Sequence, residues 1–192
     1  MPKTTNPAGE NARYDNVAIS LHWLIMLLIL SLYGIGWYMV DTPDGSLIRT
    51  QLFALHKSIG LTTALFILCR IVWRMTHIPP TLPETVQPWQ GKLASLTHLS
   101  LYLLMVLQPL SGYLSSSFSG YKTRVWGVPL PQWGWKEPVL NQLFTDIHVL
   151  SSVTLLCLII LHICGAFSHL LLRHGNVLPR MWPGSPGRKQ PG

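Results

Sequence analysis

The 192-residue sequence predicts an all-α integral membrane protein, a bundle of four helices that cross the bilayer. Of these residues, 48% are hydrophobic and only 11% are charged, whereas soluble domains average about 25% charged. The apolar residues gather in four runs, and each is long enough to cross the hydrocarbon, which takes about 20 residues. Most of the eight histidines fall within or at the ends of these runs, where ionisable residues are costly and usually functional.

The four runs span residues 17–40, 52–75, 93–115 and 143–172. Each is expected to be a helix because lipid offers the backbone no hydrogen-bond partner. The first run is too long for the apolar part of a signal peptide and has no small-residue cleavage site, so we expect a membrane helix there. The fourth run is long for one span, which predicts that it tilts or projects beyond the hydrocarbon. We therefore expect an N-terminal segment (1–15), a helical domain (16–175) and a disordered tail (176–192).

The placement of lysine and arginine predicts the orientation, because basic residues are retained on the cytoplasmic side. Nine lie at the termini or around the second connection: Lys3, Arg13, Arg70, Arg74, Lys92, Arg173, Arg180, Arg188 and Lys189. Five lie around the first and third connections: Arg49, Lys57, Lys122, Arg124 and Lys136. Both termini are therefore expected in the cytoplasm. The net charge of +7 does not indicate nucleic-acid binding, because the basic residues follow no single face.

The connections are expected to differ. The second is rich in proline and reads as a short extended linker. The third, residues 116–142, carries Trp126, Trp133 and Trp135. These tryptophans are interpreted as anchors at the membrane surface, and the alternative is that they cover a site on the outer face. Gly34 and Gly36 are interpreted as positions that let helices pack closely, and Pro109 is expected to kink the third helix.

Four histidines are expected to form two layers. His148 and His162 are 14 residues apart, which in a helix is about 21 Å with only about 40° of rotation between them. They therefore share one face of the fourth helix. The outer layer pairs His148 with His56, and the inner layer pairs His162 with His22. Each layer offers two imidazoles from different helices, which fits axial ligation of two b-type haems stacked across the membrane.

Other interpretations of the histidines stay open. A single intramembrane histidine more often bonds a neighbouring helix than a cofactor. Zinc would need cysteine or acidic partners nearby, and Asp146 is the only acid close to the histidines of the fourth helix. His98 lies at a depth similar to that of His22, so it is a rival to His162 as a ligand. If His162 is the ligand, we expect His98 to bond a haem propionate.

Propionates need cationic or hydrogen-bonding partners near the membrane surface. Arg70 and Arg74 lie at the inner end of the second helix, and Lys57 and Arg124 are candidates at the outer end. We select Arg70, Lys57 and His98 as cofactor-binding residues. The alternative for the two arginines is that they extend to the lipid headgroups and only set the topology.

Seven short motifs occur in order along the chain: Ser20-Leu21-His22-Trp23; Leu55-His56-Lys57-Ser58-Ile59-Gly60; His98 with Leu101-Tyr102-Leu103-Leu104; Pro109-Leu110-Ser111-Gly112; Trp126-Gly127-Val128-Pro129-Leu130-Pro131; His148 and His162 with His169; and Leu178-Pro179-Arg180-Met181. From about residue 13 to 183, their order and spacing resemble the prokaryotic cytochrome b561 family of four-helix dihaem membrane proteins. The resemblance implies that His22 and His162 bind the inner haem, and that His56 and His148 bind the outer one. It also implies the bacterial inner membrane as the location. One departure is that His169 is followed by Leu170, where the family often has adjacent histidines, so a quinone-binding role rests on His169 alone.

The leading functional hypothesis is transfer of single electrons between a periplasmic donor and the ubiquinone pool. Some family members resemble superoxide:ubiquinone oxidoreductases, which makes superoxide a candidate donor and the chain a candidate enzyme. A second hypothesis is a membrane-anchor cytochrome b subunit of a dehydrogenase or hydrogenase, which would have a partner subunit. The third, a transporter with structural histidines, predicts polar residues along a path, and the helices offer few.

Overall fold

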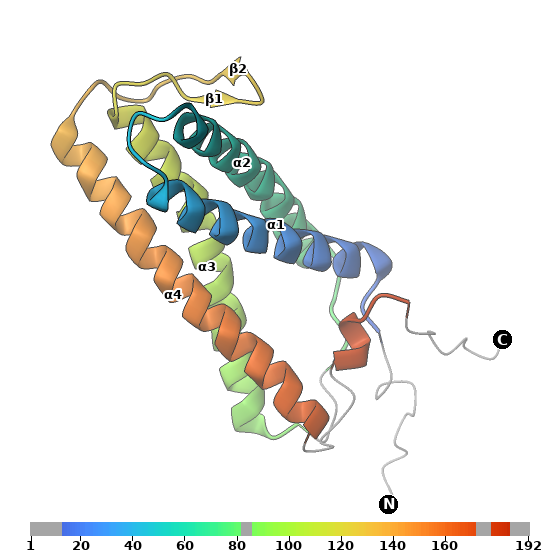
Figure 1. The fold of residues 1–192 in the computed structure, drawn as a ribbon. Helices are drawn as coiled ribbons and strands as arrows, with labels where there is room; N and C mark the ends of the chain where they lie inside the picture. The colour runs from blue at the N-terminus through green and yellow to red at the C-terminus, as the bar shows by residue number, and fades with distance from the viewer. Residues whose placement is uncertain (1–12, 82–85, 172–177, 185–192) are drawn as a thin grey trace, which may run out of the picture.

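The computed structural model describes residues 13–81, 86–171 and 178–184 (Figure 1). Its four helices are α1 (Asn16–Asp41), α2 (Leu47–Thr76), α3 (Pro88–Phe118) and α4 (Pro138–Leu171). All four are long and apolar enough to cross a membrane. The predicted all-α membrane fold with four spans is therefore confirmed.

The helix starts have local causes in the sequence. The Asp15 side chain accepts a hydrogen bond from the Ala18 amide (2.8 Å) and caps α1. Ser46 does the same for α2 through the Arg49 amide (3.2 Å). Helix α3 starts with Pro88, preceded by a capping box between Gln87 and Gln90. Such bonds satisfy amides that have no partner within the helix.

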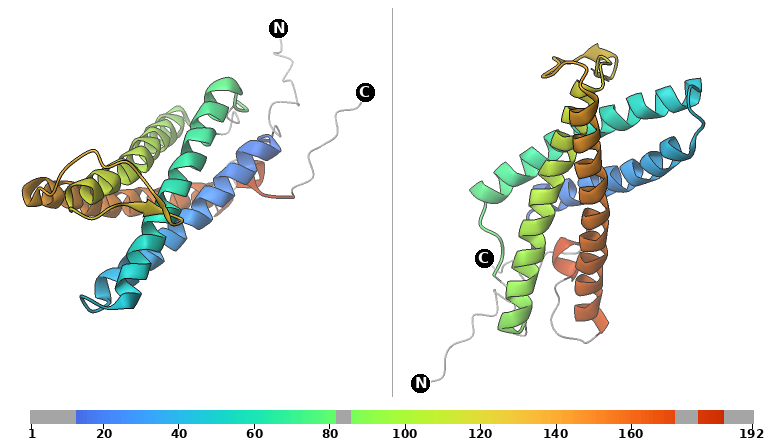
Figure 2. Two further views of the ribbon diagram at one scale, coloured as in Figure 1. Left: turned by 90° about the horizontal axis from the view of Figure 1, so that it is seen from above. Right: turned by 90° about the vertical axis from the view of Figure 1, so that its left-hand side faces the viewer.

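The four helices form two antiparallel hairpins, α1–α2 and α3–α4, which cross each other (Figure 2). Helix α2 contacts α3, and the Tyr33 hydroxyl of α1 donates to the Ser152 carbonyl of α4 (2.7 Å). The described N-terminal and C-terminal residues lie together, since the Tyr14 amide donates to the Arg180 carbonyl (3.2 Å). We call this the termini end of the bundle, and the opposite end the hairpin end.

The hairpin end takes its name from two short strands between α3 and α4. Strands β1 (Arg124–Val125) and β2 (Val128–Pro129) pair antiparallel. Trp126 and Gly127 between them both have positive φ, +50° and +84°, which a tight two-residue turn with this twist requires. The sequence analysis did not predict this hairpin, because two-residue strands carry no measurable periodicity.

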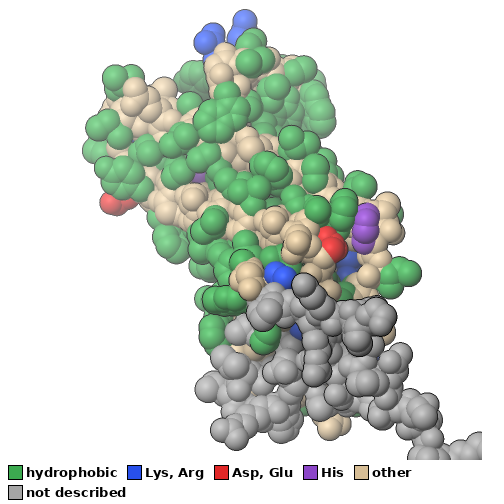
Figure 3. Space-filling model, turned by 90° about the vertical axis from the view of Figure 1, so that its right-hand side faces the viewer, with side chains coloured by type: hydrophobic (Ala, Val, Ile, Leu, Met, Phe, Trp, Pro, Cys, Tyr) green, Lys and Arg blue, Asp and Glu red, His purple; other side chains and the backbone are tan. Residues whose placement is uncertain are grey.

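The distribution of side chains suits a lipid environment. Large apolar side chains cover the outside (Figure 3), for example Leu27, Leu65 and Leu103, which are 58%, 59% and 64% exposed. Small hydroxyl residues lie buried between the helices: Ser58, Thr63, Thr97, Ser111, Ser116, Ser117, Thr123 and Ser151. Small residues let membrane helices approach closely, so packing and interhelical hydrogen bonds take the place of a large apolar core.

The chain after α4 differs from the disordered tail expected over residues 176–192. Residues Leu178–Met181 form a 3-10 helix, η1, which packs against α4 and accepts a hydrogen bond from Trp23 in the first turns of α1. The composition of the tail, rich in proline, glycine and basic residues, suggested disorder. Tertiary contacts of Arg180 and Trp182 instead order residues 178–184, and residues 185–192 lie outside the described part of the chain.

Candidate functional site

His56 of α2 and His148 of α4 face each other near the hairpin end. Their ring centroids are 6.3 Å apart, and the ring planes are inclined by 82°. Two glycines leave room for the rings: a Cβ at Gly36 of α1 would lie 3.5 Å from Cε1 of His56, and a Cβ at Gly112 of α3 would lie 3.1 Å from Cε1 of His148. The side chain that Gly36 meets belongs to α2 and lies at an ordinary contact distance, which agrees with the interpretation of Gly36 as a position that lets helices pack closely.

The ring of His148 is held from α3. Its Nδ1 lies 3.0 Å from the Gln108 carbonyl and 3.2 Å from Oγ of Ser111. The Gln108 side chain in turn donates to the His148 carbonyl (3.1 Å) and to Oγ of Ser151 (2.8 Å). An imidazole that donates through one nitrogen presents the other as a lone pair for a metal. The sequence analysis missed Gln108 and Ser111 as supports, although both precede Gly112 in the same helix.

His56 has no comparable support. Its Nδ1 is buried and has no hydrogen-bond partner of normal geometry among the described residues, although the Leu32 carbonyl of α1 lies nearby. Buried polar atoms are rarely left without a partner, so such an atom needs an explanation. A cofactor bound between His56 and His148 would explain why the imidazole of His56 is buried here without a hydrogen-bond partner in the described part of the chain.

His22 of α1 and His162 of α4 form the second pair, near the termini end. Their ring centroids are 6.2 Å apart, with planes inclined by 67°. Trp23 contacts His22 edge-on at 5.9 Å, and His98 of α3 lies 5.2 Å from His162. Within the described chain, neither ring of the pair makes a hydrogen bond of normal geometry.

The separations of both pairs suit one metal ion between two imidazoles. Metal–nitrogen bonds of about 2 Å on opposite sides of an ion place the two ring centres about 6 Å apart. The separations of 6.3 and 6.2 Å match this value, whereas His98 and His162 are closer. Among the described residues, no group of three or more His, Cys, Asp or Glu side chains is arranged to hold a metal ion. The donor set therefore fits a planar iron cofactor with two axial ligands better than tetrahedral zinc.

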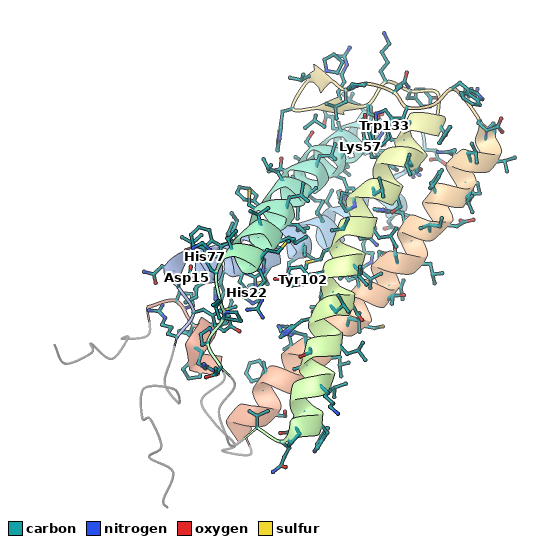
Figure 4. The ribbon with its side chains drawn as sticks, turned by 180° about the vertical axis from the view of Figure 1, so that it is seen from behind. Asp15, His22, Lys57, His77, Tyr102 and Trp133 are labelled. Carbon is teal, nitrogen blue, oxygen red and sulfur yellow. The ribbon has the colours of Figure 1, made fainter. Side chains whose placement is uncertain are left out.

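Cationic side chains accompany each pair. At the hairpin end, half-buried Lys57 donates to Oγ of Ser116 (2.8 Å), which also bonds Oγ1 of Thr123 (2.7 Å). Figure 4 shows Lys57 near the 119–137 connection and His22 toward the termini end. Near the termini pair, Arg70 donates to the Ala18 carbonyl (2.9 Å) and is close enough to interact electrostatically with both rings.

Among the described residues, neither Lys57 nor Arg70 has a carboxylate partner. Arg49 and Asp44, at the turn between α1 and α2, form the one ion pair found among the described residues (3.1 Å). A cation within a membrane protein normally pairs with an anion or bonds backbone carbonyls. Arg70 bonds the Ala18 carbonyl, whereas Lys57 bonds only a hydroxyl. Lys57 is therefore the better placed of the two to meet an acidic group of a bound molecule.

The remaining predicted residues are His169 and the tryptophans of the third connection. His169 belongs to α4, but its side chain lies outside what the structure describes. Trp126, Trp133 and Trp135 are 62%, 64% and 71% exposed, as expected of anchors at a membrane surface. Trp126 also covers part of α2, because its indole donates to Oγ1 of Thr62 (3.0 Å).

Comparison with known proteins gives a family match over most of the chain. The family model described as "Prokaryotic cytochrome b561" matches residues 13–184. Cytochrome b561 homolog 1 of Escherichia coli (strain K12) is 25% identical over 175 residues, which are 89% of this chain and 97% of that protein. Cytochrome b561 homolog 2 of the same strain is 32% identical over 117 residues, 60% of this chain and 61% of that protein. A protein of Yersinia pestis named "Probable superoxide oxidase CybB" is 24% identical over 173 residues, 89% of this chain and 96% of its own length.

Proposed function

Because the chain belongs to the prokaryotic cytochrome b561 family, a family of electron-transferring membrane cytochromes, we propose that it binds two haem b groups and relays single electrons across the membrane. His56 and His148 hold one haem near the hairpin end, and His22 and His162 hold the other near the termini end. One observation carries this proposal. Two histidine pairs with nearly equal ring separations, 6.3 and 6.2 Å, lie at opposite ends of one bundle.

Haem supplies an iron that takes up and gives back one electron, with its potential tuned by ligands, hydrogen bonds and burial. Each histidine pair would hold one haem iron, a ligand set that suits transfer of single electrons rather than binding of substrate at the metal. His148 and His162 are 14 residues apart in α4, which would place the two sites about 21 Å apart along this helix.

Lys57, Arg70 and His98 are proposed to bind the propionates. Lys57 at the hairpin end and Arg70 at the termini end have no carboxylate partner in the described chain, and charge-assisted bonds to a carboxylate are strong. His98 lies beside His162, with ring centroids 5.2 Å apart, and the 6.2 Å between His22 and His162 suits a shared iron. We therefore assign the ligand role to His162 and propose that His98 donates to a propionate.

The electron donor is proposed to act at the hairpin end, on the periplasmic side, and the acceptor is ubiquinone. The excess of lysine and arginine around the termini end supports a cytoplasmic position for both termini. His169, seven residues beyond His162 on α4, is the proposed hydrogen-bond donor to a quinone carbonyl at the termini end.

Superoxide is a second, more specific candidate for the donor. The Yersinia pestis relative is named a probable superoxide oxidase. The hairpin end of this chain carries five basic residues against four acidic ones, an excess of one positive charge: Arg49, Lys57, Lys122, Arg124 and Lys136 against Asp41, Asp44, Glu137 and Asp146. A mildly positive face attracts an anionic substrate. The proposed net reaction gives one electron from each superoxide, which leaves as dioxygen, and two such electrons with two protons convert ubiquinone to ubiquinol.

The experiment starts from protein purified in mild detergent. Its reduced-minus-oxidised spectrum and pyridine haemochrome should give two low-spin, non-covalent b haems per chain. A colourless preparation from haem-replete cells would contradict the proposal. Anaerobic addition of ubiquinol should then reduce both haems, and superoxide generated beside ubiquinone should reduce the quinone faster with the protein than without it. Copurification of a second subunit, with no response to superoxide, would favour an anchor subunit of a larger complex.

A further inference from the structure

The chain returns to the start of α1 after α4. The 3-10 helix and the following turn, residues 178–184, are called the C-terminal cap below. The indole of Trp23 donates to the Met181 carbonyl (2.8 Å). The Trp182 ring meets the Trp23 ring edge-on, with centroids 5.5 Å apart. These two contacts join the cap to the residue that follows His22 in the sequence.

The cap is also held by two other segments. The Tyr14 amide donates to the Arg180 carbonyl (3.2 Å), and the Arg13 guanidinium donates to the Trp182 carbonyl (3.1 Å). Arg180 itself is buried, 5% exposed, and donates to the Thr81 carbonyl in the connection after α2 (2.8 Å). The cap therefore ties together the segment before α1, the first turns of α1 and the connection between α2 and α3.

The contacts of His22 itself are fewer than those of its counterpart at the hairpin end. Among the described residues, hydrogen bonds to α3 hold the ring of His148, whereas no hydrogen bond of normal geometry holds the ring of His22 or, at the hairpin end, Nδ1 of His56. The position of His22 relative to His162 then depends on how α1 is placed and rotated at its first turns. Trp23 lies in those turns, and its hydrogen bond to Met181 spans 158 residues of sequence.

From these contacts we infer that the C-terminal cap is a positioning element of the termini-end histidine pair: it fixes the first turns of α1 so that His22 faces His162. Among the described residues, no hydrogen bond or ring contact joins the cap to His162, so the cap acts on the pair through α1. This inference rests on the proposed function only for the role of the pair as haem ligands. The placement of His22 relative to His162 can be measured with or without haem.

The test without haem uses cysteine cross-linking. In a background in which Cys69, Cys157 and Cys164 are replaced by serine, H22C and H162C are introduced together, and the rate of cross-linking by a short bifunctional thiol reagent is measured in membranes. W23F removes the indole N–H but keeps an aromatic ring, and W182A removes the ring that contacts Trp23. Both should slow cross-linking several-fold. W37F, which changes an exposed tryptophan of the same helix (65% exposed), should leave the rate unchanged.

A matched pair at the other end shows whether the effect is local. H56C and H148C should cross-link at the same rate with and without W23F, because neither residue contacts the cap. Equal cross-linking rates of H22C/H162C in the W23F, W182A and W37F backgrounds would overturn the inference. Equal slowing of both cysteine pairs would overturn it as well, since that result indicates general loosening of the bundle.

The test with haem uses the native histidines and compares low-spin electron paramagnetic resonance signals. W23F and W182A should shift the signal that H22A abolishes and leave the other signal in place. If the parent protein holds two haems and neither variant shifts that signal, the inference fails while the proposed function stands. If the parent protein holds no haem, the proposed function fails, and the cross-linking result alone decides the inference.

Discussion

The two ends of the bundle hold similar histidine pairs by different means. At the hairpin end, α3 fixes His148 with a carbonyl and a hydroxyl, and glycines on α1 and α3 leave space for the two rings. At the termini end, neither ring of His22 and His162 has a hydrogen bond within the described chain. Arg70, a third imidazole and the C-terminal cap surround that pair instead.

This difference shows that one ligand geometry can be reached through two kinds of support. Hydrogen bonds and steric fit set the orientation of a ring directly and involve no net charge. A cation acts on the rings at longer range through its electric field. The C-terminal cap acts through the position of the α1 backbone. Each end also has a cation close to its rings, Lys57 at the hairpin end and Arg70 at the termini end. The hairpin-end site should therefore be the more sensitive to small steric changes, and the termini-end site to changes in distant contacts.

The largest expected effect comes from removing one ligand at either end. H148A and H162A should each reduce the haem content from two per chain to one, because each iron then lacks an axial nitrogen. H98A should keep both haems. Pyridine haemochrome measurements and difference spectra check these numbers. Loss of one haem from H98A together with two haems in H162A would exchange the roles proposed for these residues.

A steric substitution should separate the two ends next. In G112A the new Cβ would lie 3.1 Å from Cε1 and 3.2 Å from Nδ1 of His148, which is overpacked and costs about 1–3 kcal/mol. We expect partial loss of the hairpin-end haem and a lower thermal unfolding temperature. G34A is the control, since a Cβ there meets nothing within 4 Å, and alanine favours helix over glycine. Equal haem content in the two variants would contradict the steric account of the hairpin end.

A change of charge at Arg70 should act mainly at the termini end. R70Q removes a cation close to His22 and His162, which stabilises the oxidised, more positive iron relative to the reduced iron. The expected change is about 1 kcal/mol, so the reduction potential of that haem should fall by about 40 mV for one electron. The hairpin-end potential should change much less. Redox titration of both haems measures this difference, and R74Q provides a more exposed arginine of the same helix for comparison. A larger shift at the hairpin end would show that the two sites are assigned the wrong way round.

The smallest expected effect concerns the helix caps and their dependence on pH. Burial alone would raise the pKa of the Asp15 carboxyl, but hydrogen bonds from the Ala18 amide and the Trp73 indole outweigh it and hold the pKa below its ordinary value of 3.8. A carboxyl with a lowered pKa stabilises the folded protein above about pH 4, and this contribution disappears as the pH falls through the lowered pKa.

The corresponding variants are D15A at the termini end and S46A at the hairpin end. Each should lower the free energy of unfolding at pH 7 by about 0.5–1 kcal/mol through loss of an N-cap. The cost of D15A should shrink as the pH falls below about 4, whereas the cost of S46A should stay constant. Thermal unfolding in detergent between pH 7 and pH 3 measures both, and a pH-independent cost of D15A would show that Asp15 caps α1 without its charge.

Much of the site was predictable because membrane helices are regular. A run of about 20 apolar residues forms a spanning helix with little alternative. Once α4 is helical, a 14-residue separation places His148 and His162 on one face at two depths. The two pairs that the structure brings together, His56 with His148 and His22 with His162, are the pairs expected from the depth of each residue.

The supports of those pairs were not predictable in the same way. Gln108 and Ser111 act on a residue about 40 positions away in the sequence. Gly36 was interpreted as a helix-packing residue, and it is the rotation of α2 that makes His56 the side chain it packs against. His98 and His162 both lie near His22, and the 6.2 Å between the rings of His22 and His162 is what favours His162 as the second member of the pair.

The sequence by itself determined that this protein has four membrane helices and where along each one the histidines lie, because backbone hydrogen bonding in lipid and the helical repeat depend on local sequence alone. The tertiary structure decided which groups hold each ring, how α1 is placed against α4, and that residues 178–184 pack onto the first turns of α1. These features depend on the relative rotation and crossing of helices. That arrangement follows from the sum of many small side-chain contacts between distant segments, so the periodic pattern of a single segment does not predict it.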